Sequence, residues 1–195
     1  RRIIMICVIL GCVAYVFFVL YDYACIYKKH KFFKYGFVAG LSLLLASTAV
    51  LVVRAFSQTE STTLRIAFLL TLAFIFLGLL IYTLFFAIPF SATYVSGGSK
   101  LCMDGVYALC RHPGVLWLAG FYCCLWLAFD TYELLAAFAA FTVLDVLYVI
   151  FQDKWTFIRM FPDYQCYKGE TPFIIPTWTS IKKCIHTLSA GKEPR

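Results

Sequence analysis

The sequence predicts an all-α integral membrane protein with about five transmembrane helices and a C-terminal interfacial segment. Three observations predict this class. The 195 residues are 63% hydrophobic and only 14% charged, whereas soluble chains are about half apolar and about a quarter charged. The apolar residues form five runs, each of about the length that a helix needs to cross a bilayer. The basic residues stand between these runs, as membrane topology requires.

The five expected spans are 3–27, 35–53, 64–86, 114–129 and 132–151. The fourth is short, and only Asp130 and Thr131 separate it from the fifth, so these two are expected to form a tight antiparallel hairpin. The first is not expected to be a cleavable signal peptide, because its apolar stretch exceeds the roughly 7 to 15 residues of a signal sequence. We therefore expect a single membrane domain over 1–186.

The distribution of Lys and Arg predicts the orientation. Five spans place the two termini on opposite sides of the membrane. One side holds Arg1, Arg2, Arg54 and Arg65, and the other holds the remaining 13 of the 17 basic residues. Because cytoplasmic loops carry the excess of Lys and Arg, the C-terminus is predicted to be cytoplasmic and the N-terminus to lie on the opposite side. Topology therefore accounts for the net charge of +7, and no nucleic-acid partner is expected.

The segments after the fifth span have a different character. Residues 152–167 mix aromatic and charged side chains, which predicts an interfacial helix. Pro172 and Pro176 exclude a regular helix over 171–178, which we expect to lie extended against the membrane surface. The tail 187–195 is expected to be disordered. The nine cysteines lack CxxC or zinc-site spacing, so free thiols and no metal are expected.

Polar residues near the ends of the last two spans predict a functional site. Because these spans form a hairpin, the start of one and the end of the other are neighbours. The residues concerned are Arg111, His112 and Pro113 before the fourth span, and Asp145, Gln152 and Asp153 near the end of the fifth. Asp145 falls about 10 Å inside the helix, at 1.5 Å per residue. An ionisable group at that depth indicates a binding cavity. The alternatives are that the Asp145 side chain extends to the membrane surface, or that it pairs with Arg111 and joins two helices.

The segment 105–114 reads G-V-Y-A-L-C-R-H-P-G. It resembles the G-x-Y-x-x-x-R-H-P signature of the isoprenylcysteine carboxyl methyltransferase and phospholipid N-methyltransferase superfamily. Residues 161–167, F-P-D-Y-Q-C-Y, and 171–176, T-P-F-I-I-P, are similar to that family's F-G-x-x-Y-x-x-Y and P-x-F-x-P run. Two positions depart from the pattern. Val115 stands where the family usually has tyrosine, and Gln152-Asp153-Lys154 stands where it usually has two glutamates.

The resemblance implies a membrane enzyme that binds S-adenosylmethionine at its cytoplasmic side, between 100–113 and 152–178. The acceptor would be a lipid-like or prenylated molecule, methylated on a carboxylate or an amine. The cofactor site would comprise Gly105, Tyr107, Arg111, His112, Pro113, Gln152, Asp153, Tyr164 and Tyr167. In it, Arg111 or His112 would face the cofactor's carboxylate, and Asp153 its ammonium group.

Three residues are candidates for acting on the acceptor. A protonated amine has to lose a proton before it attacks, and Asp145 or Asp153 would take that proton. Arg159 would hold an anionic substrate group, since a guanidinium grips carboxylate or phosphate in bidentate fashion. Contact with lipid phosphate is an equal alternative for Arg159.

Two other functions stay open. Membrane sterol and steroid reductases resemble this architecture and bind NADPH at a similar site, but they carry a proline-asparagine-tyrosine type of signature rather than R-H-P. A non-catalytic membrane protein of the same fold is the second alternative, which cofactor contact by Gln152 and Asp153 would exclude. A transporter or channel fits worst, because the ionisable residues gather at one face and the sequence has no internal repeat. Oligomeric state is not indicated.

Overall fold

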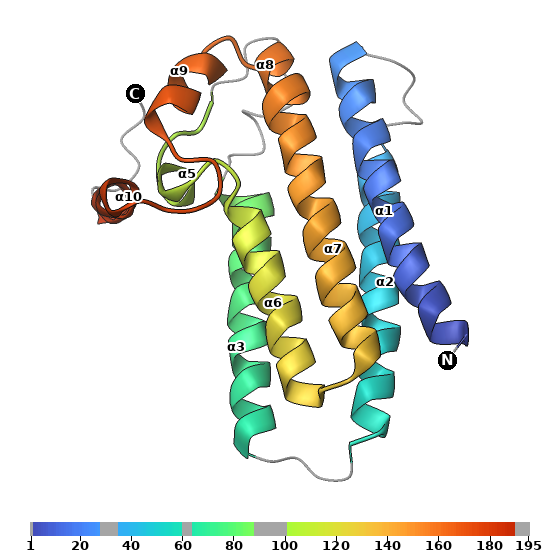
Figure 1. Cartoon of the computed structure of the whole chain (residues 1–195). Coiled ribbons are helices and arrows are strands. Elements are labelled where there is room, and N and C mark those ends of the chain that lie inside the picture. The colour runs from blue at the N-terminus through green and yellow to red at the C-terminus, as the bar shows by residue number, and fades with distance from the viewer. Residues whose placement is uncertain (1, 28–34, 60–63, 88–100, 190–195) are drawn as a thin grey trace.

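The computed structural model describes residues 2–27, 35–59, 64–87 and 101–189 (Figure 1). Every regular element within these ranges is a helix, which confirms the predicted class. Five helices run antiparallel one after another along the long axis of the molecule. They are α1 (Arg2–Tyr27), α2 (Gly36–Ser57), α3 (Leu64–Ile81), α6 (Pro113–Phe129) and α7 (Tyr132–Phe151).

Four segments of the described chain are long and apolar enough to cross a membrane: Met5–Tyr27, Gly36–Ser57, Leu64–Phe86 and Tyr132–Met160. The segment Pro113–Phe129 is apolar but shorter. Apart from the fifth pass, these segments match the expected spans closely, including the short fourth one. The chain is therefore a multi-pass membrane protein embedded in a lipid bilayer. Which terminus lies in the cytoplasm stays a prediction.

The fifth pass is longer than the sequence suggested. α7 continues without a break through a π-helical turn, η3 (Gln152–Thr156), into α8 (Phe157–Met160). The expectation of a separate interfacial helix over 152–167 is therefore wrong for its first nine residues. The helix ends only where Pro162 disfavours helical backbone at the preceding residue, and Phe161 adopts φ −125° and ψ 112°. α9 (Tyr164–Glu170) follows as a separate short helix.

The expected hairpin between α6 and α7 is confirmed. Asp130 ends α6 in the left-handed conformation, with φ 51°, and its N–H donates to the Trp126 carbonyl at 2.7 Å. Thr131 caps α7, where its hydroxyl accepts from the Leu134 N–H at 3.4 Å. Two residues thus reverse the chain and fix α6 beside α7.

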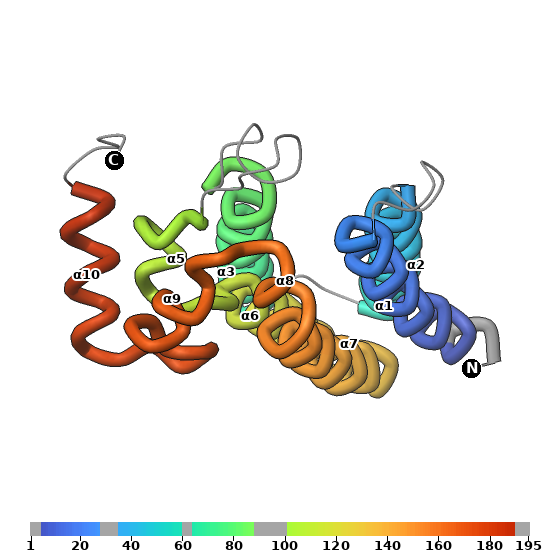
Figure 2. The backbone as a smooth tube through the Cα atoms, turned by 90° about the horizontal axis from the view of Figure 1, so that it is seen from above, coloured from blue at the N-terminus to red at the C-terminus, as the bar shows by residue number. Residues whose placement is uncertain are grey.

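The spans pack as two pairs joined by α7. α1 packs on α2, α3 packs on α6, and α7 contacts both α1 and α6 (Figures 1 and 2). Close approach depends on small residues, as is usual between helices in membranes. A Cβ atom on Gly11 would lie 2.3 Å from the Phe141 ring, and one on Gly40 would lie 2.8 Å from the Ala14 carbonyl.

The C-terminal region gathers at one end of the bundle. α5 (Val106–Leu109), α9 and α10 (Trp178–Ser189) lie there, and the N-terminus lies at the opposite end (Figure 1). The stretch expected to be non-helical was 171–178. Residues 171–177 are not helical, as the prolines predict, but Trp178 is the first residue of α10. The expectation of disorder over 187–195 is wrong for Thr187–Ser189, which form the last turn of α10, while 190–195 lie outside the described residues.

Candidate functional site

Backbone pairing joins the two motif-bearing segments. Arg111 and His112 lie in the short connection between α5 and α6, and Pro113 occupies the first turn of α6. The Arg111 N–H donates to the Pro172 carbonyl at 2.9 Å, and the His112 N–H donates to the Phe173 carbonyl at 3.2 Å. The connection is therefore fixed against the non-helical stretch after α9, although some 60 residues of sequence separate them.

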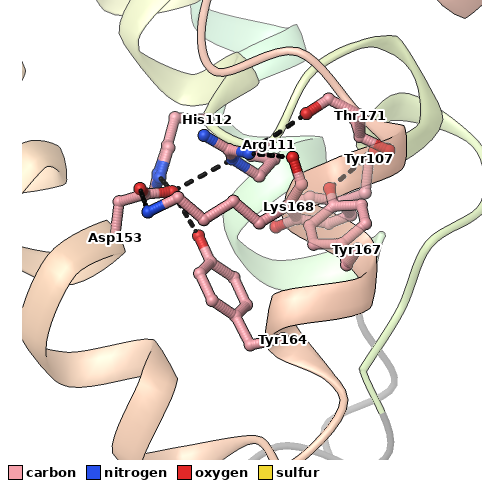
Figure 3. A network of polar contacts seen from close by, with 8 residues as sticks. All are labelled: Tyr107, Arg111, His112, Asp153, Tyr164, Tyr167, Lys168 and Thr171. Carbon is pink, nitrogen blue, oxygen red and sulfur yellow. Dashed lines mark hydrogen bonds and ion pairs between the residues drawn. The ribbon is translucent and has the colours of Figure 1, made fainter.

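The Asp153 carboxylate is the centre of a buried polar cluster (Figure 3). Its Oδ1 lies 3.0 Å from Arg111 Nε and 3.6 Å from His112 Nε2, and it accepts the Tyr164 hydroxyl at 2.6 Å. Its Oδ2 lies 2.8 Å from Lys168 Nζ. Asp153 is 4% exposed, His112 6% and Arg111 9%. Arg111 and Lys168 bring two positive charges to one carboxylate, so the cluster has room for one further negative charge.

The Arg111 side chain is held on several sides. Its Nη1 donates to the Lys168 carbonyl at 2.7 Å and to the Thr171 carbonyl at 3.2 Å. The guanidinium carbon lies 5.5 Å from the centre of the Phe173 ring, which is a cation–π distance. These contacts fix the orientation of the guanidinium toward Asp153.

The His112 imidazole lies between two aromatic rings. It stacks on Phe157 at a centroid distance of 5.8 Å and meets the edge of Phe173 at 5.1 Å. Burial lowers the pKa of His112 below its usual 6.5, and Arg111 adds to this, although Asp153 opposes it. The ring is therefore neutral at neutral pH. Within the described chain its Nε2 has no hydrogen-bond partner, and the same holds for the buried Thr171 Oγ1.

A chain of tyrosines connects the cluster to the membrane helices. The Tyr167 hydroxyl donates to the Tyr107 carbonyl at 2.6 Å, and the Tyr107 hydroxyl donates to the Thr83 carbonyl at 3.0 Å in η2 (Tyr82–Phe86). Burial raises the pKa of Tyr107, Tyr164 and Tyr167, and at Tyr164 the Asp153 charge adds to it. All three hydroxyls therefore stay protonated and act as donors. Tyr164 joins α9 to η3, Tyr167 joins α9 to α5, and Tyr107 joins α5 to η2.

Gly105 begins α5 with φ 62°, a backbone conformation that L side chains rarely adopt. Its N–H donates to the Thr187 hydroxyl of α10 at 3.0 Å. Gly105 thus sets the direction in which α5 carries Tyr107 toward the cluster.

Gln152 points away from this cluster. Adjacent residues of a helix project about 100° apart, so when Asp153 faces α9 the neighbouring Gln152 faces α1. There its Nε2 donates to Asp22 Oδ2 at 2.9 Å, and the Thr156 hydroxyl lies 3.5 Å from the same oxygen. Asp22 is buried, and the sequence pattern does not indicate its contact with Gln152.

Asp145 and Arg159 also lie apart from the cluster. Asp145 precedes Asp153 by eight residues, about 12 Å along the helix, and it interacts electrostatically with Tyr15 and Tyr122. It makes no hydrogen bond or ion pair with any described residue, and Arg111 pairs with Asp153 instead. Arg159 is exposed and lies over the Trp155 ring at 4.8 Å.

Sequence reasoning missed four residues that complete the cluster: Phe157, Lys168, Thr171 and Phe173. All four lie in or beside the motif-bearing segments, and Lys168 directly follows Tyr167. Comparison of the chain with protein-family models, with curated proteins and with solved structures gave no match. The chemistry of the site therefore follows from its own geometry.

Proposed function

We propose that this protein is an integral-membrane S-adenosylmethionine-dependent methyltransferase that acts on a lipid-like acceptor. One observation carries the proposal: the residues of two separate motifs converge on one buried carboxylate. Arg111 and His112 come from before the α6–α7 hairpin, Tyr164 comes from after it, and all three meet at Asp153. The motif resemblance predicts the same convergence.

The chemistry of the cluster fits the amino-acid end of S-adenosylmethionine, which carries a carboxylate and an ammonium group. The positive charge in excess at Arg111 and Lys168 suits the carboxylate. His112 Nε2 and Thr171 Oγ1 make no hydrogen bond within the described chain, although His112 Nε2 lies 3.6 Å from Asp153 Oδ1. Both atoms offer further polar contacts, since a buried polar atom without a hydrogen bond costs about 1 to 3 kcal/mol. Asp153 suits the ammonium group. When bound, the cofactor supplies a methyl group activated by its sulfonium charge.

Lys168 is the partner of Asp153 that a ligand would replace. The Lys168 side chain is 34% exposed, whereas those of Arg111 and His112 are 7% and 4% exposed. Exchange of the Lys168 ammonium for that of the cofactor would leave the other contacts of Asp153 in place. The residues of the cluster would then bind and orient the cofactor and exclude water from the transferred methyl group.

Asp145 favours an amine as the acceptor. Its carboxyl lies within a membrane-spanning segment and makes no hydrogen bond or ion pair with the described residues, which is costly unless a ligand compensates for it. An amine head group between the helices would provide a charge partner, and Asp145 would accept its proton before methyl transfer. A carboxylate acceptor would instead be repelled. Arg159, exposed at the end of the helix, suits a lipid phosphate.

A purely structural role is the second candidate, and a specific observation favours it. Both oxygens of Asp153 already have protein partners, so the cluster can join α5, α9 and η3 without any ligand. Such a protein would retain the fold and bind no cofactor.

Calorimetric titration of the detergent-purified full chain separates these functions. The titrants are S-adenosylhomocysteine, S-adenosylmethionine and NADPH, and the variants are His112→Ala and the matched control Arg159→Ala, which removes a cation outside the cluster. We expect the two sulfur nucleotides to bind to wild type and to Arg159→Ala but not to His112→Ala. Binding of NADPH alone would indicate a reductase. Absence of binding to folded wild type would favour the structural role.

A further inference from the structure

α10 has an exposed apolar face. Trp178, Ile185 and Leu188 are 71%, 59% and 55% exposed, and their spacing places them on one side of the helix. Such a surface on a terminal helix requires a partner, because large apolar side chains in water are unfavourable.

The neighbouring face of α10 is basic. Lys182, Lys183 and His186 are all exposed, and α10 contains no acidic residue. Lys182 Nζ lies 5.6 Å from the Trp178 ring, and Lys183 Nζ pairs with Glu170 Oε2 of α9 at 3.2 Å. Apolar and basic faces side by side are typical of helices that lie in the head-group region of a membrane.

The third face of α10 is attached to the candidate site. Ser180 and Cys184 are buried, and the Thr187 hydroxyl accepts from the Gly105 N–H at the start of α5. In Figure 1 α10 is seen end-on while the spans run up the page, and Figure 2 shows it lengthwise beside α5. The axis of α10 therefore crosses those of the spans, as it would if α10 lay parallel to the bilayer surface.

We propose that α10 lies in the head-group region of the leaflet on the candidate-site side, with Trp178, Ile185 and Leu188 inserted among anionic phospholipids. The spans cross the bilayer, so its surface surrounds the end of the bundle at which α10 lies. Lys182 and Lys183 on α10 complement anionic head groups. Because α10 holds Gly105 and thereby α5, the lipid surface positions the segment that carries Tyr107 and Arg111. This inference does not depend on the proposed methyltransferase activity.

Fluorescence quenching in lipid nanodiscs tests the insertion. The full chain and a Trp178→Phe variant are reconstituted with lipids brominated near the head-group end of the acyl chain, and the difference between them isolates Trp178 from the other tryptophans. We expect Trp178 to be quenched by these lipids and protected from aqueous iodide. Quenching by iodide would overturn the proposal, and so would protection from both quenchers, which would indicate a protein partner on this face.

A matched pair of substitutions tests which face inserts. Ile185→Asn places a polar group on the apolar face, and His186→Asn makes the same change one residue further, on the basic face. Both side chains are exposed, so neither change removes a buried contact. We expect Ile185→Asn to lose most of the quenching by brominated lipid and His186→Asn to retain it. Equal effects of the two substitutions would contradict insertion by this face.

The anionic preference has its own test. Nanodiscs of phosphatidylcholine alone are compared with discs that also contain phosphatidylserine, at low and high salt. We expect stronger quenching of Trp178 with phosphatidylserine, a reduction of that gain by salt, and a smaller gain in Lys182→Gln. Quenching that is independent of lipid charge and of salt would overturn the anionic part of the proposal.

Discussion

Asp153 is the residue on which the candidate site depends. Replacement by Asn keeps its size but leaves the Arg111 guanidinium and the Lys168 ammonium without their counter-charge. Removal of one partner from a buried ion pair typically costs about 3 to 5 kcal/mol. We therefore expect Asp153→Asn to lower the free energy of unfolding by about that amount in detergent. Asp163→Asn, at an exposed acid nearby, should change it by less than about 0.5 kcal/mol.

His112 should make stability depend on pH. Burial lowers its folded-state pKa below 6.5, so as the pH falls below about 6.5 the unfolded chain binds the proton before the folded chain does. Stability from the neutral ring is complete above this pH and is lost as the pH falls through the folded-state pKa. The expected slope is at most about 1.4 kcal/mol per pH unit.

The measurement that isolates this effect compares wild type with His112→Gln between about pH 7.5 and pH 5. Both proteins retain the other histidines and carboxylates, so the difference between their unfolding free energies reports the His112 titration alone. A difference that stays constant with pH, or that grows in favour of wild type on acidification, would contradict the lowered pKa.

At this scale the sequence predicted some of the site and not the rest. The motifs identified Arg111, His112 and Tyr164, because their order along the chain is specific. Asp153 was identified by its place near the end of the expected fifth span. The sequence did not show that Gln152 turns to Asp22, because that depends on which side of η3 faces α9. The expected depth of Asp145, about 10 Å from the helix end, is wrong because the pass continues to Met160, which lies 15 residues beyond Asp145, about 22 Å along the helix. Its neighbours Tyr15 and Tyr122 could not be predicted from the sequence.

Among the elements, α5 depends on the backbone of one glycine. Gly105 has φ 62° and ψ −131°, and such sparsely populated conformations cost about 1 to 3 kcal/mol for other residues. We expect Gly105→Ala to destabilise the protein by about this amount and to weaken any ligand binding at Arg111 and His112. Gly169→Ala is the control, since a Cβ there meets nothing within 4 Å and the residue lies within α9.

The control should be neutral or stabilising, because alanine inside a helix is favoured over glycine by roughly 0.5 to 1 kcal/mol. Unfolding of the three proteins in one detergent gives both differences. If Gly105→Ala unfolds like Gly169→Ala, the positive φ at Gly105 carries no strain.

Hydropathy predicted the helices that are surrounded by lipid. α1, α2, α3 and α7 need long unbroken apolar runs, and such runs are visible in composition alone. α10 was missed because it has apolar residues on only one face and polar residues between them, so it forms no run. The length of the fifth pass was missed because charged Asp153 and Lys154 suggested an end, whereas Asp153 finds its partners inside the protein.

For the whole molecule, α6 decides the topology. Its 17 residues span about 25 Å, against a hydrocarbon core of about 30 Å. Pro113 begins α6 directly after the buried Arg111 and His112. Because this short pass begins at a polar cluster, the cluster lies near the lipid head groups, where the proposed lipid-like substrate would reach it from the bilayer.

If α6 crosses, the chain makes five passes, and its termini lie on opposite sides with the C-terminus in the cytoplasm. Fusions to green fluorescent protein and to alkaline phosphatase, at each end of the full chain in a bacterial inner membrane, measure both positions. We expect fluorescence without phosphatase activity at the C-terminus and the reverse at the N-terminus. If both termini lay on one side, α6 would turn back within the membrane. The other described passes are all long enough to cross the bilayer. The side of the membrane on which α10 and the basic loops lie would then also change.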